Sequence, residues 1–166
     1  DSCPHVHRLH LRWTAFACLR CHLPQSHVSD QLIAAYRSAN YRVESSCEPF
    51  VLRIDQHSEP LARLFATSGH HCAAFVTACN PLGTLQTFEA NRAASARLAG
   101  RLGQLARGKG QVFAGAGGDL AGTWPEEKSF LVLGLDLDAA RALGREFSQN
   151  AIVWAGNDAI PRLVLL

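Results

Sequence analysis

The chain has 166 residues, of which 48% are hydrophobic and 18% charged, and its formal net charge is +2. These values are typical of a single globular domain with a substantial core, and the lack of any basic block argues against a nucleic-acid partner. No apolar run approaches the ~20 residues that a membrane-spanning helix needs, so we expect no membrane partner either.

The first 28 residues differ in composition from the rest of the chain. They contain five of the eight histidines and three of the six cysteines, without a helical or strand period. The string from Cys18 to His22 reads C-x-x-C-H, which occurs at covalent haem sites, and the same Cys and His density could hold zinc. The spacing matches no standard zinc finger, and the chain has no methionine to serve as an axial haem ligand. We therefore predict a poorly ordered extension over residues 1–28, with no metal and no cofactor, and a folded domain over residues 29–166.

The first part of this domain predicts a helix, two strands and a second helix. Ser29 or Asp30 can cap the first helix, and Ser58 can cap the second, which Gly69 ends. In chain order the predicted elements are a helix to residue 39, strands at 41–44 and 50–54, and a helix at 59–68.

The centre of the chain is an apolar strand that leads into a long helix. Residues 72–78 are almost all apolar, which favours a strand covered on both faces within a mixed or parallel sheet. Pro81 ends this strand because proline cannot donate to a strand ladder, and Thr87 can then cap the helix. The inward face of the helix is predicted to carry Phe88, Ser95, Leu98, Leu102 and Leu105.

Asn91 falls in the middle of this inward face. An amide that is buried there without hydrogen bonds would cost roughly 1–3 kcal/mol. We therefore predict that Asn91 is buried and bonds to the loop at Asn80 and Pro81, or to Gln149 or Asn150.

The last third of the chain predicts three more strands, a helix and a glycine-rich segment. Residues 108–125 hold this segment, which we interpret as a short strand at 111–114 followed by a flexible loop. The remaining predicted elements are a strand at 129–135, a helix from Asp136 to about 148, and a hairpin of 151–155 and 160–166. The predicted fold class is α+β, with about four helices packed against a central mixed or antiparallel sheet in a single domain.

Two cysteines indicate the redox environment of the protein. Cys72 and Cys79 lie in or beside the central strand, where we expect buried thiols rather than disulfides. Free thiols are typical of a reducing compartment, so we predict a cytoplasmic protein.

Polar side chains gather where several predicted strands begin or end. They are Asn80, Asn91, Trp124, Glu127, Gln149 and Asn150. Ligand sites collect at strand ends in α/β-type folds, and amides beside an aromatic ring could hold a base, a sugar or an amide-bearing ligand. Asparagines also cap helices and tie loops, so a purely structural role for the same residues stays open.

Three functions are compatible with this sequence. The first is a small-ligand binding or regulatory domain that uses these six residues. The second is an enzyme of unknown chemistry with Glu127 as its acid or base; Cys79 could be a nucleophile, but the sequence places no base beside it. The third is a protein-interaction or immunity-type domain whose function lies on its surface. The partner is thus an unknown small molecule or protein, and no catalytic residue is assigned.

Three sequence strings also resemble a known family. They are AFVTACNP, TWPEEKSFLVLGL, and REFSQNAIVWAG followed by the final LVLL. In this order they resemble the bacterial domain-of-unknown-function family 3293 over roughly residues 29–166. The resemblance implies a small bacterial, cytoplasmic protein and brings no assigned activity. The family often has Gly where this chain has Ser148, and a Ser where this chain has Gly83 and Thr84, so these loops differ in detail.

Overall fold

The computed structural model describes residues 28–105, 111–119, 122 and 124–166. The extension predicted over the first 28 residues lies almost wholly outside these ranges, as do its C-x-x-C-H string and the other possible zinc ligands. What the sequence predicts for that segment therefore stays a prediction.

Over the described residues the chain forms four α-helices, a short 3-10 turn and seven strands. In chain order they are α1 (Asp30–Ser38), β1 (Asn40–Val43), β2 (Phe50–Leu52), α2 (Glu59–Ser68), β3 (Ala73–Thr77), η1 (Pro81–Gly83), α3 (Phe88–Leu105), β4 (Val112–Gly118), β5 (Glu127–Leu133), α4 (Leu137–Glu146), β6 (Ala151–Ala155) and β7 (Arg162–Leu165). The predicted α+β class is confirmed. Among these helices, none is both long and apolar enough to cross a membrane.

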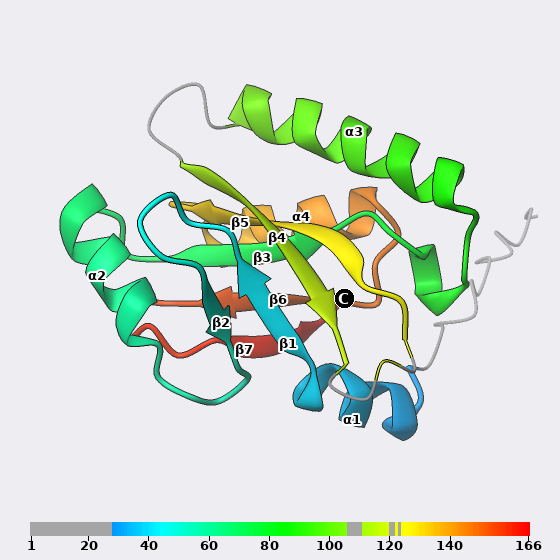
Figure 1. Cartoon of the computed structure of the whole chain (residues 1–166), viewed down its shortest axis with the longest axis horizontal. Helices are drawn as coiled ribbons and strands as arrows, with labels where there is room; N and C mark the ends of the chain where they lie inside the picture. Colours follow the sequence, from blue (N-terminus) through cyan, green and yellow to red (C-terminus); the bar gives the residue numbers. More distant parts are fainter. Residues whose placement is uncertain (1–27, 106–110, 120–121, 123) are drawn as a thin grey trace, which may run out of the picture.

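All seven strands form one curled sheet in the order β2-β1-β4-β5-β3-β6-β7 (Figure 1). Every neighbouring pair is antiparallel, so of the two predicted sheet types the antiparallel one is correct. The central strand β3 lies between β5 and β6 and is buried on both faces, as its apolar sequence predicts. The parallel neighbours that such a run also suggested are absent from the described sheet, because hairpins and helices can cover an antiparallel sheet equally well.

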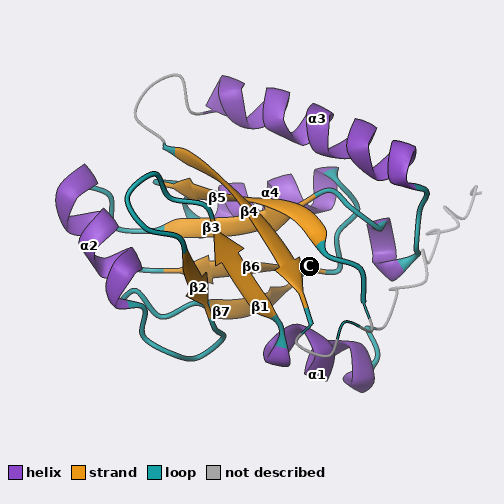
Figure 2. Ribbon diagram, in the orientation of Figure 1, coloured by secondary structure: helices purple, strands orange, loops and turns teal. Residues whose placement is uncertain are grey.

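The two faces of the sheet build two separate hydrophobic cores. The inner, concave face packs Phe75 and Leu131 against Leu61 and Phe65 of α2. The outer face packs against α3 and α4, which lie on the same side of the sheet (Figure 2). Leu98 of α3 is fully buried in this core. α1 and α2 lie at opposite ends of the curled sheet (Figure 1). Because successive side chains of a strand point to opposite faces, β3 contributes residues to both cores.

The predicted helix starts are confirmed by hydrogen bonds at the caps. Ser29 Oγ accepts from Leu32 N at 3.2 Å, and Ser58 Oγ accepts from Leu61 N at 3.3 Å. Thr87 Oγ1 starts α3 in the same way, at 3.2 Å from the backbone N of residue 90. These bonds satisfy backbone donors that have no partner within the helix.

The inward face predicted for α3 is only partly correct. Ser95, Leu98 and Leu102 are buried, whereas Phe88 is 77% exposed and Leu105 is 43% exposed. An 18-residue helix is about 27 Å long, and its first turn extends past the strands (Figure 1). Only the middle of the predicted face therefore meets the sheet.

The glycine-rich segment differs most from its prediction. Instead of a short strand and a loop, β4 continues to Gly118. A Cβ at Gly115 would lie 2.5 Å from the Arg42 carbonyl oxygen and 2.9 Å from a ring carbon of Phe75. Glycine is needed here because backbone and ring approach too closely for any side chain, which is a recognised use of glycine within a strand.

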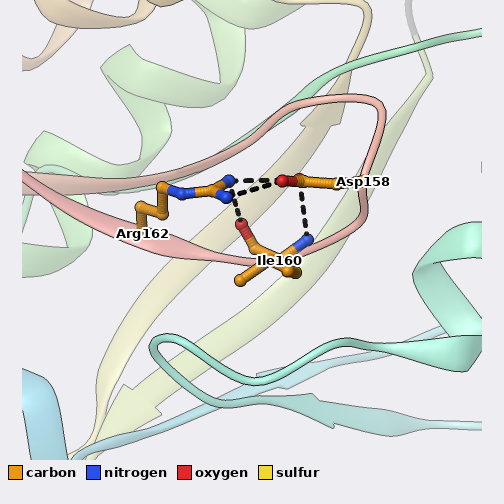
Figure 3. Close-up of polar contacts among 3 residues, drawn as sticks. All are labelled: Asp158, Ile160 and Arg162. Carbon is orange, nitrogen blue, oxygen red and sulfur yellow. Dashed lines mark hydrogen bonds and ion pairs between the residues drawn. The ribbon is translucent and has the colours of Figure 1, made fainter.

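The predicted C-terminal hairpin is confirmed, with β6 and β7 paired antiparallel. Its turn is held by Asp158, whose carboxylate accepts from the backbone N of Ile160 and from the Arg162 guanidinium (Figure 3). These bonds lower the pKa of Asp158 to about 2, the Arg162 hydrogen bond being the largest cause. The ion pair between Asp158 and Arg162 therefore stays charged over the ordinary pH range.

Gly115→Ala should destabilise the fold by about 1–3 kcal/mol, because the added methyl group must displace backbone or the Phe75 ring. Gly100→Ala is the matched control, since a Cβ at Gly100 on α3 meets nothing within 4 Å. That change should stabilise the protein by about 0.5–1 kcal/mol. Urea unfolding of both variants measures whether each change raises or lowers the free energy of unfolding. An unchanged stability of Gly115→Ala would contradict the close approach of Arg42 and Phe75 to Gly115.

Candidate functional site

A pocket of about 190 Å³ lies between α1 and the inner face of the sheet. Four of the six predicted site residues line it: Asn80, Trp124, Glu127 and Gln149. α1 contributes Leu32 and Tyr36, and Phe75 forms part of the sheet side. The structure therefore brings most of the predicted polar cluster around one concave space.

The pocket owes its space to a missing side chain on β4. Gly117 pairs with Tyr41 on β1 and with Glu127 on β5, so the three residues form a row across the inner face. A Cβ at Gly117 would lie 3.7 Å from Tyr41 and 3.8 Å from Ser129 Oγ, which are ordinary contacts. The row thus has room for a side chain that the sequence does not provide.

Glu127 is the central polar group of the pocket. Its Oε1 accepts hydrogen bonds from Asn80 Nδ2 at 2.7 Å and from Trp124 Nε1 at 2.8 Å. Oε2 has no hydrogen-bond partner among the described residues. One carboxylate oxygen is therefore fixed by the protein, and the other remains an available acceptor in the pocket.

Burial raises the pKa of Glu127 above its ordinary value, because a charge is poorly solvated in the pocket. The hydrogen bonds from Asn80 and Trp124 act in the opposite direction, since they favour the charged form. Burial is the larger effect. Glu127 is thus a carboxyl group whose proton affinity is increased by its surroundings.

Asn80 holds Glu127 from a strained and buried position. The residue is only 4% exposed and its backbone is left-handed, with φ of 45°. Asparagine tolerates this conformation better than most residues. Its Oδ1 accepts from Gln86 N and from Asn91 Nδ2, each at 2.9 Å, which turns Nδ2 toward Glu127.

The hydrogen bond predicted for Asn91 is present. Asn91 Oδ1 accepts from Asn80 N at 2.9 Å, so two bonds join these asparagines. Asn91 is half-buried rather than fully buried, and it lines a separate hollow beside α3 instead of the Glu127 pocket. Its position makes it a support for Asn80, without contact to the pocket.

Gln149 and Asn150 connect the same region to α4 and α1. Gln149 Nε2 donates to the Cys79 carbonyl and to the Phe147 carbonyl, both at 3.2 Å. Asn150 Nδ2 donates to the Tyr36 hydroxyl at 3.4 Å. Gln149 therefore lines the pocket and also links the backbone after β3 to the backbone at the end of α4. Asn150 does not line the pocket but contacts Tyr36, which does.

Tyr36 of α1 is not among the six residues that the sequence predicts for the site. In the structure Tyr36 lines the pocket, and the Tyr41 hydroxyl donates to its backbone carbonyl at 2.6 Å. Burial raises the pKa of the Tyr36 hydroxyl, the Asn150 bond lowers it, and the negative charge of Glu127 raises it further. The sequence indicates this role only through the presence of an aromatic residue on a short predicted helix.

The thiol of Cys79 is surrounded by weak partners rather than a base. It is buried, with Ser95 Oγ at 3.5 Å and the Lys128 carbonyl oxygen at 3.7 Å. A cysteine nucleophile needs an adjacent base, and these contacts provide none. Within the described ranges, no three His, Cys, Asp or Glu side chains gather as a metal site.

The comparison with protein families agrees with the resemblance seen in the sequence. Residues 76–152 match the family model described as "Protein of unknown function (DUF3293)". The match supports the assignment of this segment to that family. The match is shorter than the predicted range; it includes all six predicted site residues but not α1 with Tyr36. No curated protein and no solved structure matches the chain.

Asn91→Leu should lower the stability by about 1–3 kcal/mol, because it leaves the buried Asn80 N–H without a partner and removes one of the two hydrogen bonds that Asn80 Oδ1 accepts. Gln104→Leu makes the corresponding amide-to-Leu change at an exposed position of the same helix. It should shift the stability by no more than about 0.5 kcal/mol. Thermal unfolding of both variants provides the comparison, and equal losses would argue against the Asn80–Asn91 link.

Glu127→Gln should change how stability depends on pH. Because the folded pKa of Glu127 is raised, the folded protein keeps this proton at pH values where the unfolded chain has released it. Wild-type stability should therefore fall as pH rises from the ordinary value of 4.5 through the folded pKa. Gln keeps an oxygen for Asn80 and Trp124 but cannot ionise, so it removes this fall.

Denaturant unfolding of both proteins between about pH 4 and pH 8 tests this prediction. The stability difference should grow in favour of the variant as pH rises, and then level off. Glu126→Gln, at an exposed glutamate that pairs with Arg42, is the matched control. A control with the same pH trend would contradict the assignment to Glu127.

Proposed function

We propose that this domain binds a small molecule in the pocket lined by Glu127, Asn80, Trp124 and Tyr36. The observation that carries the proposal is Oε2 of Glu127, an acceptor that has no partner among the residues the structure describes and that lies in a mostly apolar pocket. A buried carboxylate is costly unless it is well bonded. A carboxylate used only to hold the fold would be expected to bond through both oxygens, whereas here all the supporting bonds go to one.

The supporting bonds favour a prepared binding site. Asn80 is itself fixed by Gln86 and Asn91, and Trp124 is fixed through its Nε1, so the groups around Glu127 do not need to rearrange for a ligand. Preorganised polar groups reduce the free-energy cost of binding. The few polar groups and the predominantly apolar walls are the usual composition of small-molecule sites.

The size of the pocket limits the ligand. A dry cavity of about 150 Å³ can hold a benzene molecule, so a pocket of about 190 Å³ has room for one ring and a short polar substituent. Drug-sized ligands occupy larger clefts of about 300–1,000 Å³. A base-sized ring or a compact metabolite therefore fits better than an extended cofactor.

Catalysis is the second candidate function, with Glu127 as general acid or base. The raised pKa of Glu127 favours it, because catalytic carboxyl groups are often shifted in this direction by burial. Once a ligand is known, Glu127→Gln separates the two functions by product analysis. Product formed by wild type and not by the variant would identify an enzyme, while an unchanged ligand would leave a binding domain.

The cysteines support the cytoplasmic location expected from the sequence. Cys47, Cys72 and Cys79 are all free, and Cys79 is buried while Cys72 is half-buried. Free thiols are favoured in a reducing compartment. We infer that the protein works in the cytoplasm of a bacterial cell, as its family resemblance implies.

Gly117→Leu tests the pocket by filling it. The new side chain would extend from the row between Tyr41 and Glu127 into the pocket, without a close backbone contact at its Cβ. A library of single-ring fragments, screened by ligand-observed NMR, should include binders of the wild type that this variant no longer binds. Gly103→Leu makes the same change on α3, where a Cβ meets nothing within 4 Å, and should retain them.

The result would count against a small-molecule site if no fragment bound the wild type. It would count equally against it if Gly117→Leu, still folded by circular dichroism, bound the same fragments with the same affinity.

A further inference from the structure

The charged residues that line the described part of the pocket are acidic. Among the described residues that line it, Asp119 and Glu127 are acidic, and none is Lys, Arg or His. Asp119 accepts from the backbone N of Trp124 at 3.2 Å. Glu127 contributes Oε2, which has no partner among the described residues. A negative potential in a low-dielectric space attracts cations and repels anions.

Aromatic residues form a large part of the remaining wall. Tyr36, Tyr41, Phe75 and Trp124 all line the pocket. Tyr41 and Phe75 pack edge to face, with ring centroids 5.4 Å apart. The indole of Trp124 is fixed by its hydrogen bond to Glu127. Aromatic rings attract ammonium groups through their negative faces, and aromatic walls combined with a carboxylate are suited to such cations.

We infer that the ligand of this pocket is a small organic cation, an amine that carries one ring or an equivalent apolar group. The inference rests on the proposed function and specifies its ligand class. The ammonium group donates to Glu127 Oε2, and the apolar part occupies the space beside Gly117. The same carboxylate disfavours an anionic ligand, and a neutral donor would form a weaker bond because it lacks the charge.

The bound cation would also offset the unfavourable burial of Glu127. A carboxylate that is partly desolvated gains most from an opposite charge placed directly against it. Asn80 and Trp124 hold Oε1 but leave the negative charge uncompensated, because both are neutral donors. Arg42, which could neutralise a carboxylate, is instead paired with the exposed Glu126 at 3.0 Å.

Three ring compounds of similar size and different charge test this inference. They are benzylamine, benzyl alcohol and benzoate, titrated into the whole protein by isothermal calorimetry near neutral pH. Benzylamine should bind at least about tenfold more tightly than benzyl alcohol, which is the advantage of a charge-assisted bond, and benzoate should not bind measurably.

Two variants locate the effect. Glu127→Gln should weaken benzylamine binding about tenfold, to the level of benzyl alcohol, and leave benzyl alcohol binding unchanged. Glu126→Gln removes a charge from the adjacent residue, outside the pocket, and should leave benzylamine binding as in the wild type. Thermal unfolding confirms that both variants are folded.

The outcomes separate the two proposals. If benzyl alcohol or benzoate bound as tightly as benzylamine or more tightly, the inference of a cationic ligand would be overturned. The proposal of a small-molecule site would still hold. Benzylamine binding that Glu127→Gln does not affect would overturn the inference of a cationic ligand too, since the amine would then bind elsewhere. If none of the three compounds bound, the inference of a cationic ligand would again be overturned. The fragment screen with Gly117→Leu would then test whether the pocket binds a small molecule at all.

Discussion

Two glycines on the inner face of β4 are the constraint on which this structure depends. Gly115 lets the Arg42 carbonyl and the Phe75 ring approach the strand more closely than any side chain would allow. Gly117, two residues further on the same face, leaves the row between Tyr41 and Glu127 open. The missing side chains therefore have opposite consequences, because a ring fills the first space and the second remains a pocket.

The link between Asn80 and Glu127 connects this pocket to the rest of the fold. Asn80 follows β3, is fixed by Asn91 of α3, and donates to Glu127 at the start of β5. A left-handed backbone at a buried asparagine costs free energy and persists only where the surroundings enforce it. Such local costs are expected at functional sites, where stability is exchanged for a prepared geometry. Oε2 of Glu127 fits this pattern, because a ligand can supply the bond that no described residue provides.

The family-matched segment and the rest of the chain contribute different parts of the site. Residues 76–152 supply the polar groups and the glycines of β4. α1 lies outside that segment and covers the pocket with Leu32 and Tyr36, although none of its residues is fully buried. A helix with so little buried surface is held weakly. The anchor of the proposed site is thus built into the sheet, and its cover is the less firmly held part.

The sequence by itself determined the features that depend on near neighbours. Ser29, Ser58 and Thr87 start helices because a short polar side chain before an amphipathic run satisfies the first free N–H groups. The bond between Asn91 and Asn80 could be predicted, since an amide on a packed helix face must find a partner. Only the tertiary structure decided that a glycine-rich segment is a strand and that Tyr36 meets Glu127 across a pocket. Glycine favours loops unless another part of the chain needs the space, and that need arises from Arg42 and Phe75, which are distant in the sequence.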